Sequence, residues 1–518
     1  MPDLPPARLV LANLDAEAEL AELRERAELA ERAELAELAE LAELAELAEL
    51  AKLRELSELS ELSEDTERRQ HDGAPPPLPR RPRGRRTWTP AASASAAGAA
   101  TLLRAFCRPG DRLWTPAPVA PDRLAVLPGV PLPELASGPV AAQHPAEELL
   151  AWCETPSAKA LRQGSGGRPD GVAPEAFSRS PAGLAADGAR EVRDVGTPRE
   201  RRHLATAHEL HDVLWRLPKP EPAVVALVHH RALCLGVQRR LGRALPGACM
   251  VDSYGALEAH LAAGAAAGGS WVVKAPLSAA GRARAISYDS DHASLANPAF
   301  RRRVENLFRR HGPLLFEPWM DRLADFGAAG LLLPGGAVRW VGFHSQRIDA
   351  RGQFVGLDLE AAGPDPWEAV AAAGAHPAAA RATRPAEAAG AIHRLAGLPP
   401  ADREDWLQAL AAAAGALVHA GYVGPFGVDA WLYRGEDGAA RLHPLGEINA
   451  RITFGLVARV LVDRLRGPLG LDAGDRLGLA FGRPPAAAAP GAEVVPLLLA
   501  GAAGEPGAWL EIPAARPR

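Results

Sequence analysis

The sequence predicts a multidomain protein that combines α/β and α+β architecture, and three observations lead to this fold class. The chain has 518 residues, which is enough for two to four domains with ample hydrophobic cores. Between residues 87 and 245, short strand-like runs alternate with helix-forming stretches, which is typical of an α/β domain. From residue 246 onward, strand-like runs are joined by short turns, and polar side chains follow one face of two such strands.

Composition and charge exclude several classes of function. The net charge of -5 and the pI near 6.3 argue against a nucleic-acid-binding protein, which normally has a basic surface. We find no secretory signal at the N-terminus and no apolar run long enough to cross a membrane. The scattered cysteines lack metal-ligand spacing and are typical of reduced thiols. We therefore expect a cytoplasmic protein without a nucleic-acid or membrane partner, and the oligomeric state stays open.

Residues 1–245 are interpreted as an N-terminal α/β domain that carries an unusual insertion. A first strand at residues 7–13 leads into a tract of Leu-Ala-Glu triplets at about 17–64, rich in strong helix formers. On an α-helix, a leucine at every third position lies about 60° behind the previous leucine around the helix axis. The leucines therefore wind round the whole helix and form no coiled-coil seam. We interpret the tract as an inserted low-complexity helix. A partner-binding helix is the alternative.

The rest of this domain reads as loops, strands and one helix. Residues 71–86 are rich in proline and arginine and are interpreted as a solvated loop. The clearest strands are 111–114 and 223–228, and a helix opens at residues 229–231 and runs towards Leu241. His229 and His230 themselves are interpreted as loop or strand-end residues, because no third ligand is spaced to form a metal site with them.

A lysine stands out in the next segment. Only four of the 58 basic residues are lysines, and Lys274 lies inside an apolar strand at 270–276. A buried lysine needs an anionic partner, unless its aliphatic side chain extends far enough for the ammonium group to reach water at the sheet edge. The following loop at 277–284 consists largely of small residues and leads to a returning strand at 285–288. Small residues let backbone N–H groups approach phosphate oxygens, and a nearby lysine supplies positive charge.

A hinge-like segment follows this loop. Residues 297–310 have helical character, and residues 313–320 read as a strand that ends in a proline-fixed turn. The turn contains Glu317, Trp319 and Met320. Core packing is the alternative role for Trp319, because buried aromatic side chains are mostly structural.

The most informative motif lies near the end of the chain. Asp429 ends one strand-like run, and Glu447, Asn449 and Arg451 are spaced two apart on the next. Residues two apart on a strand point to the same face. The polar segment 433–438 predicts a hairpin turn that brings the two strands together. Two carboxylates and an amide oxygen on one face suit Mg²⁺, and the arginine suits an anion beside it.

The order of these segments, across residues 246–475, resembles the ATP-grasp superfamily of the carboxylate–amine ligase type. The resemblance implies a lid subdomain at 246–317 and a larger C-terminal subdomain at 318–480, with ATP bound between them. The remaining residues, 481–518, form an Ala/Pro/Gly-rich tail. Two features depart from the family pattern. The loop after Lys274 has a single glycine, and Arg231 is the nearest basic residue to the helix start where the family often has a second phosphate-binding lysine.

The resemblance also implies roles for individual residues. Arg451 is expected to stabilise the oxyanion or hold the substrate carboxylate, and Mg²⁺, with Mn²⁺ as an alternative, is expected at Asp429, Glu447 and Asn449. Asp325 is our choice for the ribose hydroxyls, with Asp321 as a rival. The full set expected to bind ATP is Lys274, Ser278, Gly281, Glu317, Trp319, Met320 and Asp325.

The function implied is an ATP-dependent ligase that joins a small-molecule carboxylate to an amine through an acyl-phosphate. One alternative keeps ATP binding but has kinase-like or no ligase activity. Another is a scaffold that acts through the Leu-Ala-Glu helix. His344 lies on a predicted strand and faces either the substrate or the protein core. The identities of the carboxylate and the amine are not encoded in any motif.

Overall fold

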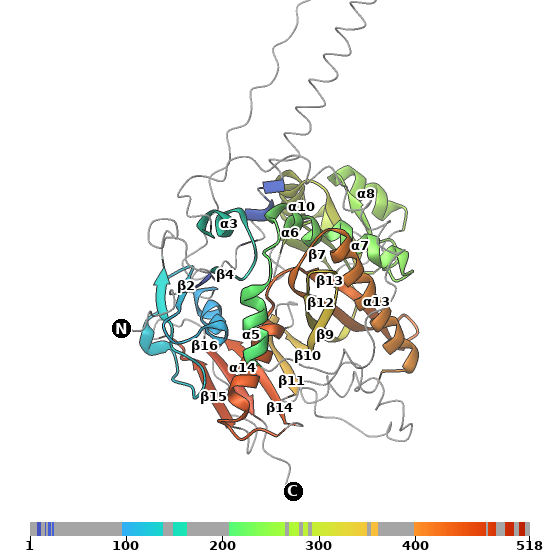
Figure 1. Ribbon diagram of the computed structural model, residues 1–518. Helices are drawn as coiled ribbons and strands as arrows, with labels where there is room; N and C mark the ends of the chain where they lie inside the picture. The colour runs from blue at the N-terminus through green and yellow to red at the C-terminus, as the bar shows by residue number, and fades with distance from the viewer. Residues whose placement is uncertain are drawn as a thin grey trace, which may run out of the picture.

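The computed structural model shows three β-sheets, two of four strands and one of eight (Figure 1). It describes residues 8–11, 16, 19–21, 23–24, 96–137, 149–162, 207–264, 269–278, 283–288, 293–349, 354–360, 398–472, 475–482, 493–501 and 507–512. Most of the predicted helix at 17–64, and all of the predicted loop at 71–86, lie outside these residues. No helix in the described part is long and apolar enough to cross a membrane.

The first sheet belongs to the N-terminal region and is parallel, with the strand order β3-β2-β1-β4. The carboxyl ends of parallel strands meet at one edge of a sheet, so the segments that follow β1 and β4 start from the same edge. The strands predicted at 7–13 and 111–114 are confirmed as β1 and β2. The elements are β1 (Leu9–Leu11), β2 (Arg112–Thr115), β3 (Glu134–Ser137), β4 (Leu149–Ala151), η1 (Thr101–Phe106), η2 (Pro121–Arg123), α3 (Pro156–Arg162) and α5 (Ala207–Arg216).

One predicted strand is wrong, because residues 223–228 lie in helix α6 (Pro222–His229). Pro222 stands at the start of the helix, where its missing N–H costs nothing. The apolar run is only six residues long, and a short apolar run has no periodicity that separates a buried strand from a buried helix. Helix α7 (Arg231–Arg240) follows as predicted, and the ring of His230 caps it by accepting a hydrogen bond from the Ala232 N–H at 3.2 Å.

The second sheet is antiparallel, with the order β5-β8-β6-β7, and lies within the predicted lid. Helix α10 begins where predicted, because the side chain of Asn297 accepts hydrogen bonds from the first N–H groups and Pro298 occupies the first position. It ends at Gly312, whose φ of 66° suits glycine. The elements are β5 (Cys249–Val251), α8 (Tyr254–Ala262), β6 (Trp271–Lys274), β7 (Arg284–Ser287), α9 (Ala293–Ala296), α10 (Pro298–His311) and β8 (Leu314–Pro318).

The third sheet is the largest and is antiparallel, with the order β13-β12-β9-β10-β11-β14-β16-β15. Two helices cover its opposite faces near β10. Phe343 contacts Trp406 of α13, whereas the next residue, His344, points towards α14. The elements are β9 (Arg322–Leu332), β10 (Val338–Ile348), β11 (Phe354–Glu360), α13 (Pro400–His419), β12 (Gly424–Arg434), β13 (Ala440–Asn449), α14 (Phe454–Arg466), β14 (Arg476–Gly482), β15 (Glu493–Leu498) and β16 (Gly507–Ile512).

The expected tail at 481–518 is corrected by the structure, because β15 and β16 extend the large sheet. Leu497 and Leu510 are buried, and the buried Arg104 of η1 donates a hydrogen bond to the Leu497 carbonyl at 2.9 Å. The abundance of Ala, Gly and Pro hid two short apolar strands that only pairing with β14 reveals. The boundaries of the lid and the C-terminal subdomain stay predictions.

Candidate nucleotide and metal site

The predicted pairing of the two motif strands is confirmed. Asp429 of β12 lies directly opposite Glu447 of β13, and Gly427 lies opposite Asn449. The turn between the strands is held by the Gly435 N–H, which donates to the Ala439 carbonyl at 2.8 Å. Because directly opposed residues share a face of the sheet, Asp429, Glu447 and Asn449 present their oxygens to the same side.

The carboxyl group of Asp429 has a strongly perturbed pKa. Burial, followed by the charge of Glu447, raises its pKa to about 7. Two amides oppose this shift by donating to the carboxylate, Gln346 at 2.6 Å and Asn449 at 2.9 Å. The charge of Arg451 also lowers the pKa of Asp429, but it does not outweigh burial and Glu447. A divalent cation held between the two carboxylates would supply the compensating charge.

The oxygen donors suit Mg²⁺ better than a metal ion whose ligands must all come from the protein. The described residues contain no cluster of three or more His, Cys, Asp and Glu side chains arranged to hold a metal. Here two carboxylates are joined by the amide of Asn449, whose Oδ1 accepts a hydrogen bond from Arg451 at 3.0 Å. Mg²⁺ usually binds one or two carboxylates and completes its shell with water and substrate phosphates. The donor set therefore fits Mg²⁺ that arrives with a nucleotide.

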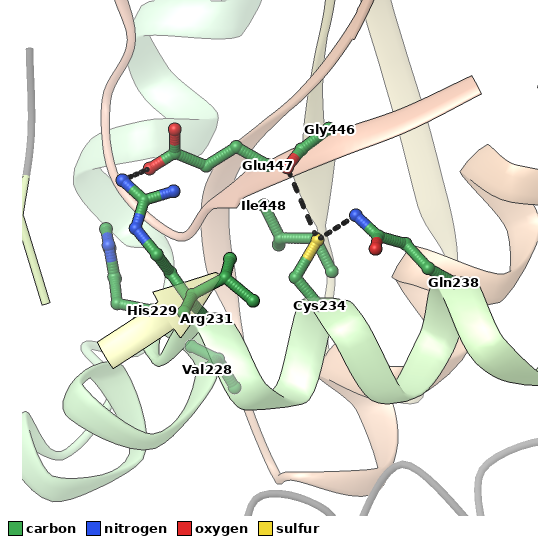
Figure 2. Close-up of a pocket in the computed structure, with 9 residues that line it drawn as sticks. Val228, His229, Arg231, Cys234, Gln238, Gly446, Glu447 and Ile448 are labelled. Atoms are coloured by element: carbon green, nitrogen blue, oxygen red, sulfur yellow. Dashed lines mark hydrogen bonds and ion pairs between the residues drawn. The ribbon is translucent and has the colours of Figure 1, made fainter. Parts of the chain in front are cut away.

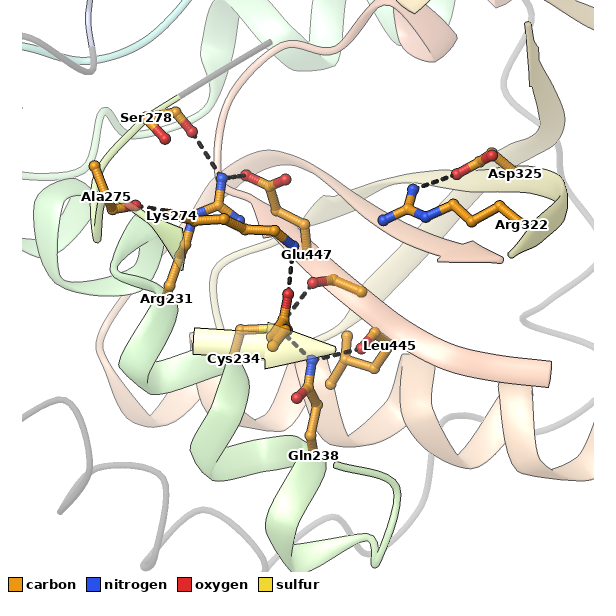
Figure 3. Close-up of polar contacts among 12 residues, drawn as sticks. Arg231, Cys234, Gln238, Lys274, Ala275, Ser278, Arg322, Asp325, Leu445 and Glu447 are labelled. Atoms are coloured by element: carbon orange, nitrogen blue, oxygen red, sulfur yellow. Dashed lines mark hydrogen bonds and ion pairs between the residues drawn. The ribbon is translucent and has the colours of Figure 1, made fainter. Parts of the chain in front are cut away.

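Arg231 connects the candidate metal face, formed by Asp429, Glu447 and Asn449, to the loop after Lys274 in the predicted lid, a contact that the sequence alone did not reveal (Figure 3). Its Nη2 lies 3.2 Å from Glu447 Oε1 (Figure 2) and donates to the Ser278 carbonyl at 3.0 Å. Its Nε donates to the Ala275 carbonyl, also at 3.0 Å. The residue is buried at the start of α7. The one signal in the sequence was a basic residue at the first position of a helix.

Lys274 is buried at the end of β6, and its ammonium forms an ion pair with the buried carboxylate of Glu317 on β8. Burial lowers the pKa of Lys274, and the charge of Glu317 opposes this shift. For Glu317, burial raises the pKa, but Lys274 outweighs it, so the net shift is downward. The expected anionic partner of Lys274 is thus present within the protein, and the lysine does not reach the sheet edge.

The hinge after β8 is built from a tryptophan between two arginines. The backbone N–H of Trp319 donates to the Ser270 carbonyl at 2.8 Å. The guanidinium groups of Arg284 and Arg322 lie 5.4 Å and 5.5 Å from the Trp319 ring centroid. Arg322 also lies 3.9 Å from the ring centroid of Trp431, two residues beyond Asp429 on β12. The hinge and the metal strand therefore approach each other through Arg322.

Of the remaining residues predicted to bind ATP, the structure describes Met320 and Asp325 but not Gly281. Met320 packs against the small apolar cluster that includes Trp431. Asp325 is buried on β9 and pairs with Arg322 at 2.6 Å, whereas its rival Asp321 is exposed and pairs with Arg434 at 3.2 Å. Gly281 lies outside the described residues. Their roles in nucleotide binding stay predictions.

Arg451 lies where the N-terminal sheet meets the large sheet. Strand β13 ends at Asn449, so a turn positions Arg451, and its Nη2 still donates to Asn449 Oδ1 at 3.0 Å. Its guanidinium lies 5.4 Å from the ring centroid of Trp152, which follows β4. The Ile452 N–H donates to the Trp152 carbonyl at 3.0 Å. The edge of the parallel sheet thus reaches the metal face.

His344 is a structural residue. Its ring fills the space between Gly327 of β9 and Gly455 of α14, where a Cβ at either glycine would come within 2.3 Å of the ring. Burial lowers the pKa of His344 to about 4, so the ring stays neutral at physiological pH. The two glycines leave room for the imidazole, which therefore packs within the protein.

Comparisons with known proteins give structural matches only. No family model matches the chain, and no curated protein matches it. Among solved structures, N5-carboxyaminoimidazole ribonucleotide synthetase from Thermus thermophilus is 14% identical, with a TM-score of 0.39, and the match covers 80% of this chain and 92% of that one. L-amino acid ligase from Bacillus licheniformis is 13% identical, with a TM-score of 0.33, and 59% and 72% are covered.

A third match is the biotin carboxylase domain of 2-oxoglutarate carboxylase from Hydrogenobacter thermophilus, solved with MgADP, ADP and bicarbonate. It is 15% identical, with a TM-score of 0.34, and covers 57% of this chain. This chain spans 64% of that domain's length. At these identities and TM-scores, the matches carry no conclusion about the superfamily or the reaction of this chain, and the ATP-grasp resemblance stays a prediction from the motif order.

Proposed function

We propose that the protein is an ATP-dependent ligase that joins a small-molecule carboxylate to an amine through an acyl-phosphate. One observation carries the proposal. Arg231 touches both Glu447 of the metal face and the Ser278 carbonyl of the loop after Lys274. The lid and the large sheet therefore converge on one place, where cationic groups lie beside a pair of carboxylates.

The phosphates of ATP would lie between these groups. Lys274 supplies positive charge from the predicted lid and Arg231 from the start of α7, and both are buried, where charge-assisted hydrogen bonds are strongest. The ion pair between Lys274 and Glu317 holds the lysine at the end of β6. The backbone of the hinge at Glu317–Met320 would bind adenine, and Asp325 would bind the ribose.

Asp429, Glu447 and Asn449 would hold Mg²⁺, with Mn²⁺ as an alternative, and the bound ion would neutralise charge on the transferred phosphoryl group. The protein's own contribution here is orientation. Gln346 donates to one oxygen of Asp429 and Asn449 to the other, so the carboxylate is fixed in one rotamer. Such support of a ligand by neighbouring side chains is common in metal sites.

The reaction proceeds in two steps. An oxygen of the substrate carboxylate attacks the γ-phosphorus, the bond to the β,γ-bridging oxygen breaks, and ADP leaves. The amine nitrogen then attacks the acyl carbon, and phosphate leaves with the bonding electrons. Arg451, which lies beside Asn449, would hold the carboxylate and stabilise the oxyanion that forms on its carbonyl oxygen.

A screen of amino acids and small carboxylates, each paired with an amine, tests this proposal by measuring phosphate release from ATP. We expect release that requires both substrates and is lost in Glu447→Gln. ADP formation that continues over many turnovers with only one acceptor would favour the kinase-like alternative, because the ligase forms at most one ADP per enzyme before the amine is needed. Deletion of residues 17–64 addresses the scaffold alternative, because a ligase should keep its turnover without them. Absence of ATP binding in the intact protein would refute the proposal.

A further inference from the structure

Arg322, the first residue of β9, covers the ring of Trp431 on the neighbouring strand β12. Its guanidinium carbon lies 3.9 Å from the ring centroid, which is close enough for cation–π stacking. Trp431 is buried, whereas the side chain of Arg322 is 27% exposed, so this arginine is the partly exposed group that covers the ring. The proposed mechanism gives no role to either residue.

The same guanidinium pairs with Asp325, the residue proposed to bind the ribose (Figure 3). Its Nη1 lies 2.6 Å from Asp325 Oδ1. Asp325 and Trp431 lie directly opposite each other on β9 and β12, so their side chains are neighbours on one face of the sheet. Arg322 therefore occupies, at the same time, a carboxylate and an aromatic ring that lie side by side.

The hinge borders the same place. Met320 packs against the apolar cluster that contains Trp431, and the Arg322 guanidinium lies 5.5 Å from the ring centroid of Trp319. A base bound by the backbone of the hinge, with its ribose on Asp325, would therefore meet the ring of Trp431. Nucleic-acid bases stack on aromatic side chains, and so does a planar guanidinium. The base and Arg322 thus compete for one surface.

The position of the Trp431 ring is fixed from the opposite strand, β13. The ring lies over Gly446, where a Cβ would come within 1.8 Å of it, and its centroid lies 4.4 Å from that of the His443 ring. Neither contact involves Arg322. The ring can therefore keep its place when the arginine leaves, as a stacking surface requires.

We infer that the purine of the nucleotide stacks on Trp431, and that Arg322 holds this place in the empty protein and leaves it when the nucleoside binds. This inference rests on the proposed nucleotide site. Release of Arg322 also frees the Asp325 carboxylate for the ribose hydroxyls. The arginine lowers nucleotide affinity, but it keeps an aromatic ring covered and a buried carboxylate paired while the site is empty, and both would be unfavourable without it.

Isothermal titration calorimetry with adenosine measures this competition, because adenosine carries no phosphate that Arg322 could attract. In Arg322→Ala we expect adenosine to bind at least about fivefold more tightly, because binding no longer breaks the contact between the guanidinium and the ring. Arg284→Ala is the matched control, since Arg284 lies 5.4 Å from the ring centroid of Trp319 and belongs to β7. We expect this control to change adenosine affinity by less than about twofold.

Fluorine nuclear magnetic resonance of the full chain, labelled with fluorotryptophan, observes the ring itself, and Trp431→Phe assigns its signal. Saturating adenosine should shift the Trp431 signal in the wild-type protein, whereas Trp406, which packs against Phe343, should keep its signal. Without ligand, Arg322→Ala should also shift the Trp431 signal. Thermal unfolding shows whether each variant folds, and the wild-type spectra remain a test if Arg322→Ala does not.

The outcomes separate this inference from the proposed function. Weaker adenosine binding in Arg322→Ala would mean that the guanidinium contacts the nucleoside, and unchanged binding would mean that it does not compete. A Trp431 signal that stays fixed while adenosine binds would mean that the base stacks elsewhere. Each of these results overturns the inference and leaves the nucleotide site standing. If the wild-type protein binds neither ATP nor adenosine, the proposed function fails and the inference fails with it.

Discussion

Replacement of Lys274 by methionine is expected to weaken ATP much more than adenosine, because the lost contact is to phosphate. The lysine is 9% exposed and Glu317 only 1%, so the interaction occurs away from water. A charge-assisted hydrogen bond is worth roughly 1.5–3 kcal/mol. This corresponds to an affinity loss for ATP of about 10- to 150-fold. Isothermal titration calorimetry with MgATP and adenosine measures both affinities on the same protein.

The ion pair makes a control necessary. Loss of Lys274 leaves the Glu317 carboxylate buried without its cation, which costs about 3–5 kcal/mol of stability. The double variant Lys274→Met with Glu317→Gln removes the stranded charge, and urea unfolding should show that most of the stability returns. We expect the ATP-specific loss of affinity to persist in this double variant. Equal weakening of ATP and adenosine in both variants would show that Lys274 supports the strand, and would refute its role as a phosphate ligand.

Four further predictions concern the candidate site and the groups that support it. Glu447→Gln, Asn449→Ala and Asp429→Asn should each cut Mg²⁺-dependent turnover by at least about tenfold, and wild-type rates at limiting Mg²⁺ in all three would mean that the metal site is misplaced. Because the pKa of Asp429 is raised to about 7, protons compete with the metal below that pH, so Mn²⁺ binding measured by electron paramagnetic resonance should strengthen from pH 6 to pH 8. The raised pKa of Asp429 also stabilises the metal-free folded state at low pH. The free energy of unfolding of the metal-free protein should therefore decline as the pH rises from about 4 to 7. Gly455→Ala should destabilise the protein by about 1–3 kcal/mol, since its Cβ would lie 2.3 Å from the His344 ring, whereas Gly255→Ala in α8, with nothing within 4 Å, should be neutral or stabilising. Thermal unfolding that ranks the two alanine variants equally would contradict this account of His344.

The comparison of sequence and structure is clearest at β12 and β13. The two-residue spacing of Glu447 and Asn449, and the polar turn before them, predicted a hairpin with a shared polar face, and the register pairs Asp429 with Glu447. The same reasoning failed for residues 223–228, which form α6. Each strand of a hairpin has its pairing partner close by in the sequence. Whether an isolated apolar run forms a strand or a helix depends instead on what it packs against.

The sequence by itself determined the local geometry of the candidate site: the hairpin of β12 and β13, the strand that contains Lys274, and the helix that opens near Arg231. Each of these depends on side-chain alternation, turn residues or capping groups within about 25 residues of chain. Only the tertiary structure decided which groups meet across longer distances. Gln346 reaches Asp429 from a different part of the large sheet, and Arg231 reaches Glu447 from α7.

The physical reason is the nature of these long-range contacts. They join charged and polar groups whose preference for one another carries no periodicity, so any of the many arginines could have filled the position of Arg231. Burial then made the difference, because a charge removed from water must find a partner nearby. The sequence thus determined which residues are candidates for the site, and the packing of three sheets determined which of them lie together.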